Sequence, residues 1–258
     1  MKGILFCDID GTLIPYGEKE IRPSLLSTLQ EAIRKDWMLC IATGRVYDSV
    51  RQTLPMLEGS AYFSCSSGAC LYYQGREAMP SEFLDKKTVA ELVQAASEFH
   101  CTIIFSVPEG MYAIGPLYPY TDNLFRKQHT IPVPVENLHQ FPSDRVCVCT
   151  LQFPQDQEIP IDALRGRWQG RLSWGQGGPC LVDAGRSDKG MAVERVLDYF
   201  HIPREDSYAF GDYDNDLPML RAVGHGYLMA DTGRRKLLDV FPSHCDDIEA
   251  TIRGIISR

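Results

Sequence analysis

The chain has 258 residues, of which 44% are hydrophobic and 23% charged, and this balance excludes a wholly disordered protein. Lys and Arg number 26 against 34 Asp and Glu, so the formal net charge is −8. That balance argues against a nucleic-acid-binding protein, because such proteins present a basic face to phosphates.

No apolar run approaches the roughly 18 residues of a membrane span, and acidic residues interrupt the first apolar run before a signal-peptide core develops. The nine cysteines, an odd number without a repeating framework, are expected to be buried thiols rather than disulfides or zinc ligands. We therefore expect a cytoplasmic protein that binds neither nucleic acid nor membrane. No feature of the sequence indicates an oligomeric state.

The first part of the chain alternates between short apolar runs and helical periodicity. The runs 3–7, 38–42 and 61–65 are typical of buried strands, and apolar residues recur at helical spacing over 23–33 and 47–57. Strands that alternate with helices in this order predict a parallel α/β sheet.

The pattern changes between about residues 81 and 180, where helices are mixed with hairpin-like strands. The elements expected here are helices over 88–100, 122–128 and 161–168 and strands over 102–105, 111–114, 145–153, 171–174 and 180–184. This mixture predicts an inserted α+β unit rather than more of the parallel sheet.

The alternation of strands and helices returns after residue 187. The elements expected here are helices over 189–200, 217–222 and 247–257 and strands over 208–210 and 227–230. The predicted fold class is therefore α/β: a doubly wound parallel-sheet core made of residues 1–80 and 184–258, interrupted by an α+β cap over residues 81–183.

Two acidic residues, Asp8 and Asp10, follow the first strand directly. Residues two apart in an extended chain project to the same side, so both carboxylates can converge on one site. Such a pair suits a hard divalent cation, above all Mg²⁺, because two unpaired carboxylates repel each other. A turn with two solvated acids is the alternative. Gly11 lets the chain turn sharply after this strand.

Three further elements lie at strand ends or at the adjoining helix start. Thr43-Gly44-Arg45 follows the second strand, where a hydroxyl and free backbone N–H groups can hold phosphate or simply cap a helix. Lys189 begins a helix, and for a single lysine a surface position is the usual alternative. Gly211-Asp212-Tyr213-Asp214-Asn215-Asp216 follows a late strand, where its acids could also form a solvated loop.

Ligands bind open α/β sheets outside the carboxyl ends of the strands, so these four elements are expected to meet. Together they supply a carboxylate nucleophile, a second carboxyl group, a hydroxyl, an ammonium group and an acidic cluster that can bind a metal. This set of groups predicts phosphoryl transfer, in which positioning and charge neutralisation do most of the catalysis.

The sequence resembles a known family, the haloacid dehalogenase-like (HAD) hydrolases. The resemblance rests on four motifs in order: Asp8-x-Asp10-Gly11-Thr12-Leu13, Thr43-Gly44-Arg45, Lys189-Gly190 and Gly211-Asp212-x-x-Asn215-Asp216. The insertion lies between the second and third motifs, as in the Cof-type (class IIB) branch of that superfamily.

The resemblance implies catalytic roles for four residues. Asp8 would attack phosphorus and form an aspartyl-phosphate. Asp10 would protonate the leaving oxygen and then deprotonate the water that hydrolyses the intermediate. Thr43 and Lys189 would hold the phosphoryl oxygens, and the inserted segment would be a lid over a small phosphorylated metabolite.

The resemblance also implies a Mg²⁺ site formed by Asp8, the backbone carbonyl of Asp10 and Asp212. Four further residues would support the metal shell or bind phosphate: Gly44, Arg45, Asn215 and Asp216. We therefore expect a Mg²⁺-dependent phosphatase of small phosphorylated metabolites, with sugar phosphates first among them.

Some positions depart from the usual family pattern. Ser67-Gly68 stands where Asn-Gly is frequent, Tyr213 is bulkier than the usual residue, and Met229-Ala230-Asp231 replaces a frequent Gly-Asn-Ala. None of these changes removes a catalytic group, so they bear on substrate preference and not on the chemistry. Neutral drift on a loop is the simpler explanation for each of them.

Two other functions use similar residues. A phosphosugar mutase of the phosphomannomutase kind would share the aspartyl-phosphate step and move phosphate within a hexose. The alternative that is not an enzyme is a non-catalytic sugar-phosphate sensor or a receiver-like signalling domain. A receiver is shorter and takes its phosphate on an Asp after the third strand, where this chain has Ser66 and Ser67.

Overall fold

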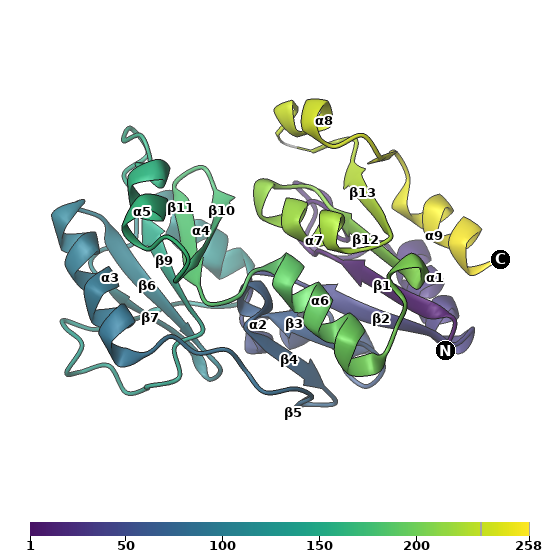
Figure 1. Cartoon of the computed structure of the whole chain (residues 1–258), viewed down its shortest axis with the longest axis horizontal. Helices are drawn as coiled ribbons and strands as arrows, with labels where there is room; N and C mark the ends of the chain where they lie inside the picture. Colours follow the sequence, from purple (N-terminus) through teal and green to yellow (C-terminus); the bar gives the residue numbers. More distant parts are fainter. Residues whose placement is uncertain (233, 258) are drawn as a thin grey trace.

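The structure, a computed structural model, describes residues 1–232 and 234–257. Two β-sheets lie side by side in it, each with its own helices (Figure 1). Both chain termini belong to the half that contains the larger sheet, and the middle of the chain forms the other half (Figure 1).

The larger sheet is mostly parallel. Its strands follow the order β14 (His244–Cys245), β13 (His225–Met229), β12 (Ser207–Gly211), β1 (Gly3–Cys7), β2 (Trp37–Ala42), β3 (Tyr62–Cys65), β4 (Cys70–Tyr73) and β5 (Arg76–Glu77). Neighbouring strands from β14 to β3 are parallel, and β4 and β5 are added antiparallel.

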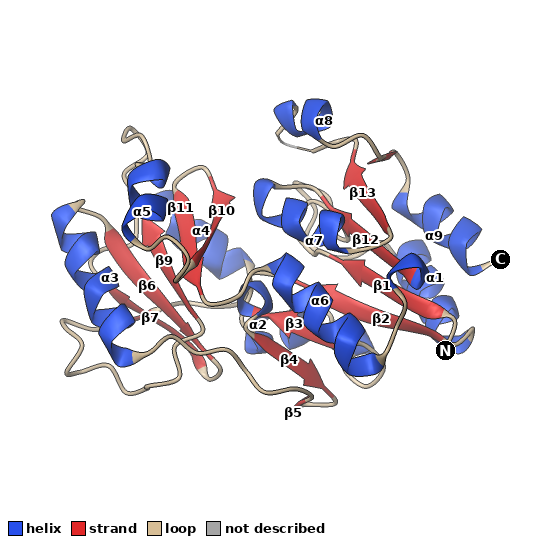
Figure 2. Ribbon diagram, in the orientation of Figure 1, coloured by secondary structure: helices blue, strands red, loops and turns tan. Residues whose placement is uncertain are grey.

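Helices cover both faces of this sheet, so its central strands are almost entirely buried (Figure 2). One face packs against α1 (Pro23–Arg34), α2 (Tyr47–Thr53) and α9 (Ile248–Ile256). The other face packs against α6 (Lys189–Phe200), α7 (Leu217–Ala222) and α8 (Lys236–Val240).

The order of the strands reverses its direction at β1. From β1 the chain builds outward through β2 and β3, and later returns to build outward on the other side through β12 and β13. The carboxyl ends of β1 and β12 therefore lie side by side at the point where an open α/β sheet leaves room for a ligand.

The smaller sheet is mostly antiparallel. Its order is β10 (Ser173–Gly178), β11 (Leu181–Gly185), β9 (Val148–Gln152), β6 (Thr102–Val107), β7 (Gly110–Ile114) and β8 (Val133–Pro134). Its apolar face packs under α3 (Lys86–Glu98) and α5 (Ile161–Arg167), and α4 (Pro119–Lys127) packs Phe125 against the other face.

These elements confirm the predicted α/β fold class, and the middle of the chain forms the α+β unit. The division at residues 81 and 183 stays our interpretation, and β11 runs past it to Gly185. The helix predicted over 47–57 was wrong in length: α2 ends at Thr53, and a separate 3₁₀ turn covers Pro55–Leu57. Pro55 breaks the helix because it lacks a backbone N–H and disfavours the helical conformation at Leu54.

Short elements escaped prediction because few residues define them. They include β4, β5, β8, α8 and β14, together with the 3₁₀ turns η2 (Ser66–Gly68), η3 (Arg204–Asp206) and η4 (Asp214–Asp216). All nine cysteines are free thiols, and Cys101 is partly exposed while the other eight are buried. No helix within the described ranges has both the length and the apolar character needed to cross a membrane.

Gly190 offers a test of the close packing between α6 and α7. A Cβ at Gly190 would lie 2.8 Å from the backbone and side chain of Pro218. We expect Gly190→Ala to lower the free energy of unfolding by about 1–3 kcal/mol, because the two helices must move apart.

Gly254 is the matched control, because it lies in α9 where an added methyl group has room. A Cβ at Gly254 would have no atom of the described residues within 4 Å beyond the backbone of its own helix. Gly254→Ala should raise the free energy of unfolding by up to about 1 kcal/mol, since alanine favours helices. Urea unfolding of both variants measures the difference. Equal stability of the two variants would contradict the packing described here.

Candidate active site

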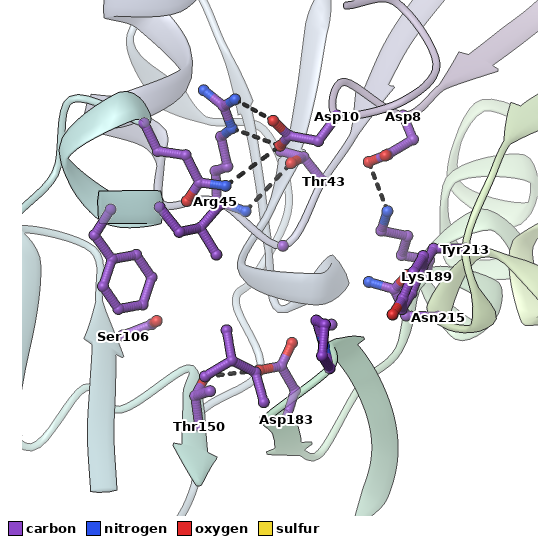
Figure 3. A pocket seen from close by; sticks show the side chains of 18 of the residues that line it. Asp8, Asp10, Thr43, Arg45, Ser106, Thr150, Asp183, Lys189, Tyr213 and Asn215 are labelled. Atoms are coloured by element: carbon purple, nitrogen blue, oxygen red, sulfur yellow. Dashed lines mark hydrogen bonds and ion pairs between the residues drawn. The ribbon is translucent and has the colours of Figure 1, made fainter. Parts of the chain in front are cut away.

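A cavity of about 530 Å³ lies between the carboxyl edge of the larger sheet and one face of the smaller sheet. Figure 3 shows Asp8, Lys189 and Asn215 on one side of it and Ser106, Thr150 and Asp183 across from them. The predicted site residues that line this cavity are Asp8, Asp10, Thr43, Gly44, Arg45, Lys189 and Asn215.

Asp8, Lys189 and Asp216 form a buried network at the floor of the cavity. The Nζ of Lys189 donates to Oδ1 of Asp8 at 2.7 Å and to Oδ1 of Asp216 at 2.6 Å. The three side chains are at most 9% exposed. The ammonium group of Lys189, at the start of α6, is therefore within hydrogen-bond distance of the carboxylate that follows β1 and of the carboxylate in η4.

Burial and charge act in opposite directions in this network. Burial raises the pKa of Asp8 well above its usual range, and the charge of Lys189 counteracts that rise. Burial alone would lower the pKa of Lys189, but the charges of Asp216 and Asp8 outweigh it and raise that pKa. The lysine therefore stays positively charged beside Asp8.

Asp212 follows β12 and is held by two hydroxyl groups. Thr12 Oγ1 donates to its Oδ1 at 3.0 Å, and the Tyr16 hydroxyl donates to its Oδ2 at 2.6 Å. Burial, followed by the charge of Asp216, raises the pKa of Asp212 to about 7, although both hydroxyl contacts lower it. Asp212 is thus a buried carboxyl group, and the charge of Lys189 does not offset the combined effect of burial and of Asp216 on its pKa.

Asp216 organises the loop that carries Asp212. Its Oδ2 accepts from the backbone N–H groups of Asp212 at 3.0 Å and of Tyr213 at 2.9 Å. One carboxylate oxygen therefore shapes the turn while the other binds Lys189. Asn215 lies next to it in η4, and its side chain lines the cavity.

The acidic groups fit a divalent cation. One carboxylate oxygen from each of Asp8, Asp212 and Asp216 lies within 4.8 Å of the others. Gly11 keeps space beside them, because a Cβ there would lie 2.3 Å from Oδ2 of Asp212. Mg²⁺ prefers oxygen ligands such as carboxylates. The three carboxylates here can carry more negative charge than the single positive charge of Lys189 neutralises.

Asp10 stands apart from that cluster. Its carboxylate accepts from Nε of Arg45 at 2.8 Å and from Nη2 of Arg45 at 2.5 Å. Nε2 of Gln128, at the end of α4, approaches Oδ2 of Asp10 at 3.4 Å. The Arg45 side chain, proposed to bind phosphate or support the metal, is turned instead to Asp10 and to Thr53, whose Oγ1 it contacts at 2.8 Å.

Thr43 follows β2 at the cavity wall and is 1% exposed. Its backbone N–H donates to the carbonyl of Ser64 at 2.9 Å, and its Oγ1 accepts from the N–H of Arg45 at 3.2 Å. The hydroxyl thus accepts a hydrogen bond within the turn at Gly44. The alternative that Thr43 caps a helix was wrong, because α2 begins at Tyr47 with Val46 at its N-cap and no side-chain cap. Thr43 and Gly44 both face the cavity.

Several residues of the cavity were missed from the sequence. Tyr16 lies beyond the first motif in a turn, and Gln128, Thr150 and Asp183 belong to the smaller sheet and its helix α4. A contact between the two halves of the molecule leaves no local pattern in the sequence. The serine at position 67 gives a partial signal, because it stands at a family motif and contacts Asp183.

Comparison with known proteins identifies the class. A family model described as haloacid dehalogenase-like hydrolase matches residues 5–238, and the chain belongs to this family. The chain is 23% identical to the 5-amino-6-(5-phospho-D-ribitylamino)uracil phosphatase YitU of Bacillus subtilis over 237 residues, covering 88% of this chain and 86% of the relative. It is 25% identical to an HMP-PP phosphatase of an Enterobacter species over 234 residues, covering 86% and 82%.

The fold agrees with this assignment. A solved HAD subclass IIB sugar phosphatase superposes with a TM-score of 0.80 at 19% sequence identity, covering 98% of this chain and 99% of that one. The predicted membership of the HAD-like hydrolase family is thereby confirmed, and the fold is that of a solved subclass IIB protein. The expectation that the chain is an enzyme, a phosphatase of the HAD superfamily, is confirmed as well.

The raised pKa of Asp212 predicts how pH affects the metal-free protein and its response to Mg²⁺. Between about pH 4 and about pH 7 the folded state keeps a proton that the unfolded state has released, so this group makes stability fall as pH rises through that window. Protons compete with a cation for the same carboxylate below pH 7. We therefore expect Mg²⁺ to raise the Tm more at about pH 8 than at about pH 6.

Calorimetry with Mg²⁺ and with EDTA measures this difference. Asp212→Asn should lose most of the Mg²⁺-dependent rise in Tm, whereas Asp156→Asn, an exposed control, should keep it. An equal rise at both pH values, or a full rise in Asp212→Asn, would contradict the assignment of Asp212 as a metal ligand.

Proposed function

We propose that the protein is a Mg²⁺-dependent phosphatase that hydrolyses small phosphorylated metabolites, sugar phosphates first among them, through an aspartyl-phosphate on Asp8. The observation that carries the proposal is the contact between Asp8 and Lys189 at the floor of a cavity covered by the smaller sheet. The named activities of YitU and of the sugar phosphatase support small phosphorylated substrates.

In the first step Asp8 acts as the nucleophile. Lys189 binds Oδ1 of Asp8, which leaves Oδ2 to attack phosphorus. The bond from phosphorus to the leaving-group oxygen breaks as the bond to Asp8 forms. Thr43 and the backbone N–H of Gly44 bind phosphoryl oxygens, and Lys189 offsets their negative charge.

Asp10 moves the proton in both steps. In its protonated form it gives a proton to the leaving oxygen, and as a carboxylate it then takes one from the water that attacks phosphorus. That attack breaks the bond between phosphorus and Asp8 and releases inorganic phosphate. Arg45 and Gln128 fix the position of the Asp10 carboxylate, and Gln128 does so from the half of the molecule that covers the cavity.

The metal would be held by Asp8, Asp212 and the backbone carbonyl of Asp10, with Asp216 and Asn215 supporting that arrangement. When bound, Mg²⁺ supplies positive charge against the phosphoryl oxygens. The three carboxylates that lie within 4.8 Å of one another support this assignment.

Asp8→Asn tests the proposal directly. The amide keeps the shape of the side chain but is a far weaker nucleophile, so phosphate release should fall by at least about a thousandfold. The assay measures phosphate release from a panel of sugar phosphates, nucleotides and pyridoxal phosphate, with Mg²⁺ and with EDTA. Circular dichroism checks that the variant is folded, and Asp156→Asn is the control.

The other two functions give distinct results in the same assay. Isomerised sugar phosphate without free phosphate would favour a mutase, and persistent phosphoprotein without turnover would favour a sensor. Undiminished phosphate release by folded Asp8→Asn would overturn the assignment of the nucleophile.

A further inference from the structure

Asp183 in β11 is a carboxyl group that the proposed chemistry does not use. In the smaller sheet it lies opposite Thr150 of β9 and Gly175 of β10. Side chains alternate between the two faces of a strand, and its neighbours Val182 and Ala184 pack into the apolar core beneath α3 and α5. Asp183 therefore projects from the opposite face, into the cavity (Figure 3).

Two hydroxyl groups hold the Asp183 side chain in place. Thr150 Oγ1 donates to Oδ1 at 2.6 Å, and Ser67 Oγ donates to Oδ2 at 3.2 Å across the two halves of the molecule. Ser67 does so from a left-handed backbone conformation with φ 54° and ψ 34°. A carboxylate has about four acceptor positions, so each oxygen keeps one for a further donor.

No cation of the described residues forms an ion pair with Asp183, whereas the cationic side chains that line the cavity are all paired with other acids. Lys189 pairs with Asp8 and Asp216, Arg45 pairs with Asp10, and Arg234 pairs with Asp214. Burial raises the pKa of Asp183, while the contacts from Thr150 and Ser67 and, last, the charge of Lys189 lower it. Donors from a bound ligand would therefore stabilise its charged form further.

Asp183 is close to the turn that is proposed to bind phosphate. A Cβ at Gly44 would lie 4.0 Å from Oδ2 of Asp183 and 3.5 Å from Oγ of Ser67. A Cβ at Gly177 would lie 3.5 Å from the same Asp183 oxygen. The absence of side chains at both glycines leaves the carboxyl group accessible beside that turn.

Apolar and aromatic side chains also line the cavity, among them Tyr120, Phe125, Met111, Leu124 and Pro179. Such side chains suit the carbon skeleton of a leaving group.

We propose that Asp183, positioned by Ser67 and Thr150, selects substrates whose leaving group carries adjacent hydroxyl or amino donors near the phosphate ester, and disfavours leaving groups that carry a second acid. The proposal rests on the phosphatase function proposed above. It assigns to Asp183 a role in specificity, with the carboxylate accepting two hydrogen bonds from the leaving group.

The test compares two esters that differ only in donors. Glycerol 3-phosphate and n-propyl phosphate share a three-carbon leaving group, and only the first has two adjacent hydroxyls. Hydrogen bonds to a charged group predict that the wild-type enzyme favours glycerol 3-phosphate by about tenfold to hundredfold in kcat/KM. In Asp183→Asn that preference should fall to within about threefold of unity, mainly through a higher KM for glycerol 3-phosphate.

Further substrates and variants separate selectivity from general damage. Hydrolysis of n-propyl phosphate and of p-nitrophenyl phosphate, which lack donors, should change less than about threefold in Asp183→Asn. Hydrolysis of 3-phosphoglycerate, whose leaving group is acidic, should improve relative to glycerol 3-phosphate, because a negative charge is removed. Asp156→Asn should keep the wild-type preference, and Tm values check the folding of each variant.

An equal loss on both three-carbon esters would overturn the proposal, because it would assign Asp183 to folding or phosphate binding. If Asp183→Asn keeps the wild-type preference for glycerol 3-phosphate, the role of Asp183 is overturned while the proposed function stands. The same holds if the wild-type enzyme hydrolyses p-nitrophenyl phosphate but shows no preference for glycerol 3-phosphate. If the wild-type enzyme releases phosphate from none of these four compounds and from none of the sugar phosphates, nucleotides and pyridoxal phosphate in the panel above, both proposals are overturned.

Discussion

The burial of Lys189 between two carboxylates is the interaction on which the rest of the site depends. Its ammonium group lies 2.7 Å from Asp8 and 2.6 Å from Asp216, and it is 3% exposed. Removing one partner from such a buried pair generally costs about 3–5 kcal/mol, because the other charge is left uncompensated. Helix α6 must therefore begin where its first residue, Lys189, can reach both Asp8 and Asp216.

That position is fixed by ordinary helix chemistry. Asp188 caps α6, and its Oδ1 accepts from the N–H groups of Gly190 and Met191, both at 2.9 Å. Gly190 has no side chain, so the first turn of α6 can approach Pro218 closely. The cap, the glycine and the lysine are consecutive residues, and together they bring a cation to the end of β1.

The smaller sheet completes the cavity because its two faces differ. One face buries apolar side chains under α3 and α5, and the other carries Ser106, Thr150 and Asp183 towards the larger sheet. Gln128 reaches Asp10 from the same half, and Ser49 in α2 donates a hydrogen bond to its backbone carbonyl. Contacts across the cavity thus link the half of the molecule that covers the cavity to the proposed acid–base residue.

Much of this arrangement could be predicted from the sequence. The apolar runs before Asp8, Thr43 and Asp212 identified three parallel strands, and parallel strands bring their carboxyl ends to one edge. The directions of the side chains could not be predicted from the sequence. Arg45 turns to Asp10, and the carboxylate of Asp216 lies with those of Asp8 and Asp212. Asp183 could not be found, because its role depends on the packing of two sheets that are separate in the sequence.

Asp8 is proposed to carry the phosphoryl group during the reaction, and trapping the phosphorylated enzyme tests this role. Labelled substrate would be mixed with enzyme and Mg²⁺ and quenched with acid within one turnover, and the labelled peptide would be sequenced by mass spectrometry. We expect phosphate on the peptide that contains Asp8. Label on another residue, or phosphate released at the first-turnover rate with no labelled protein at any time, would contradict it.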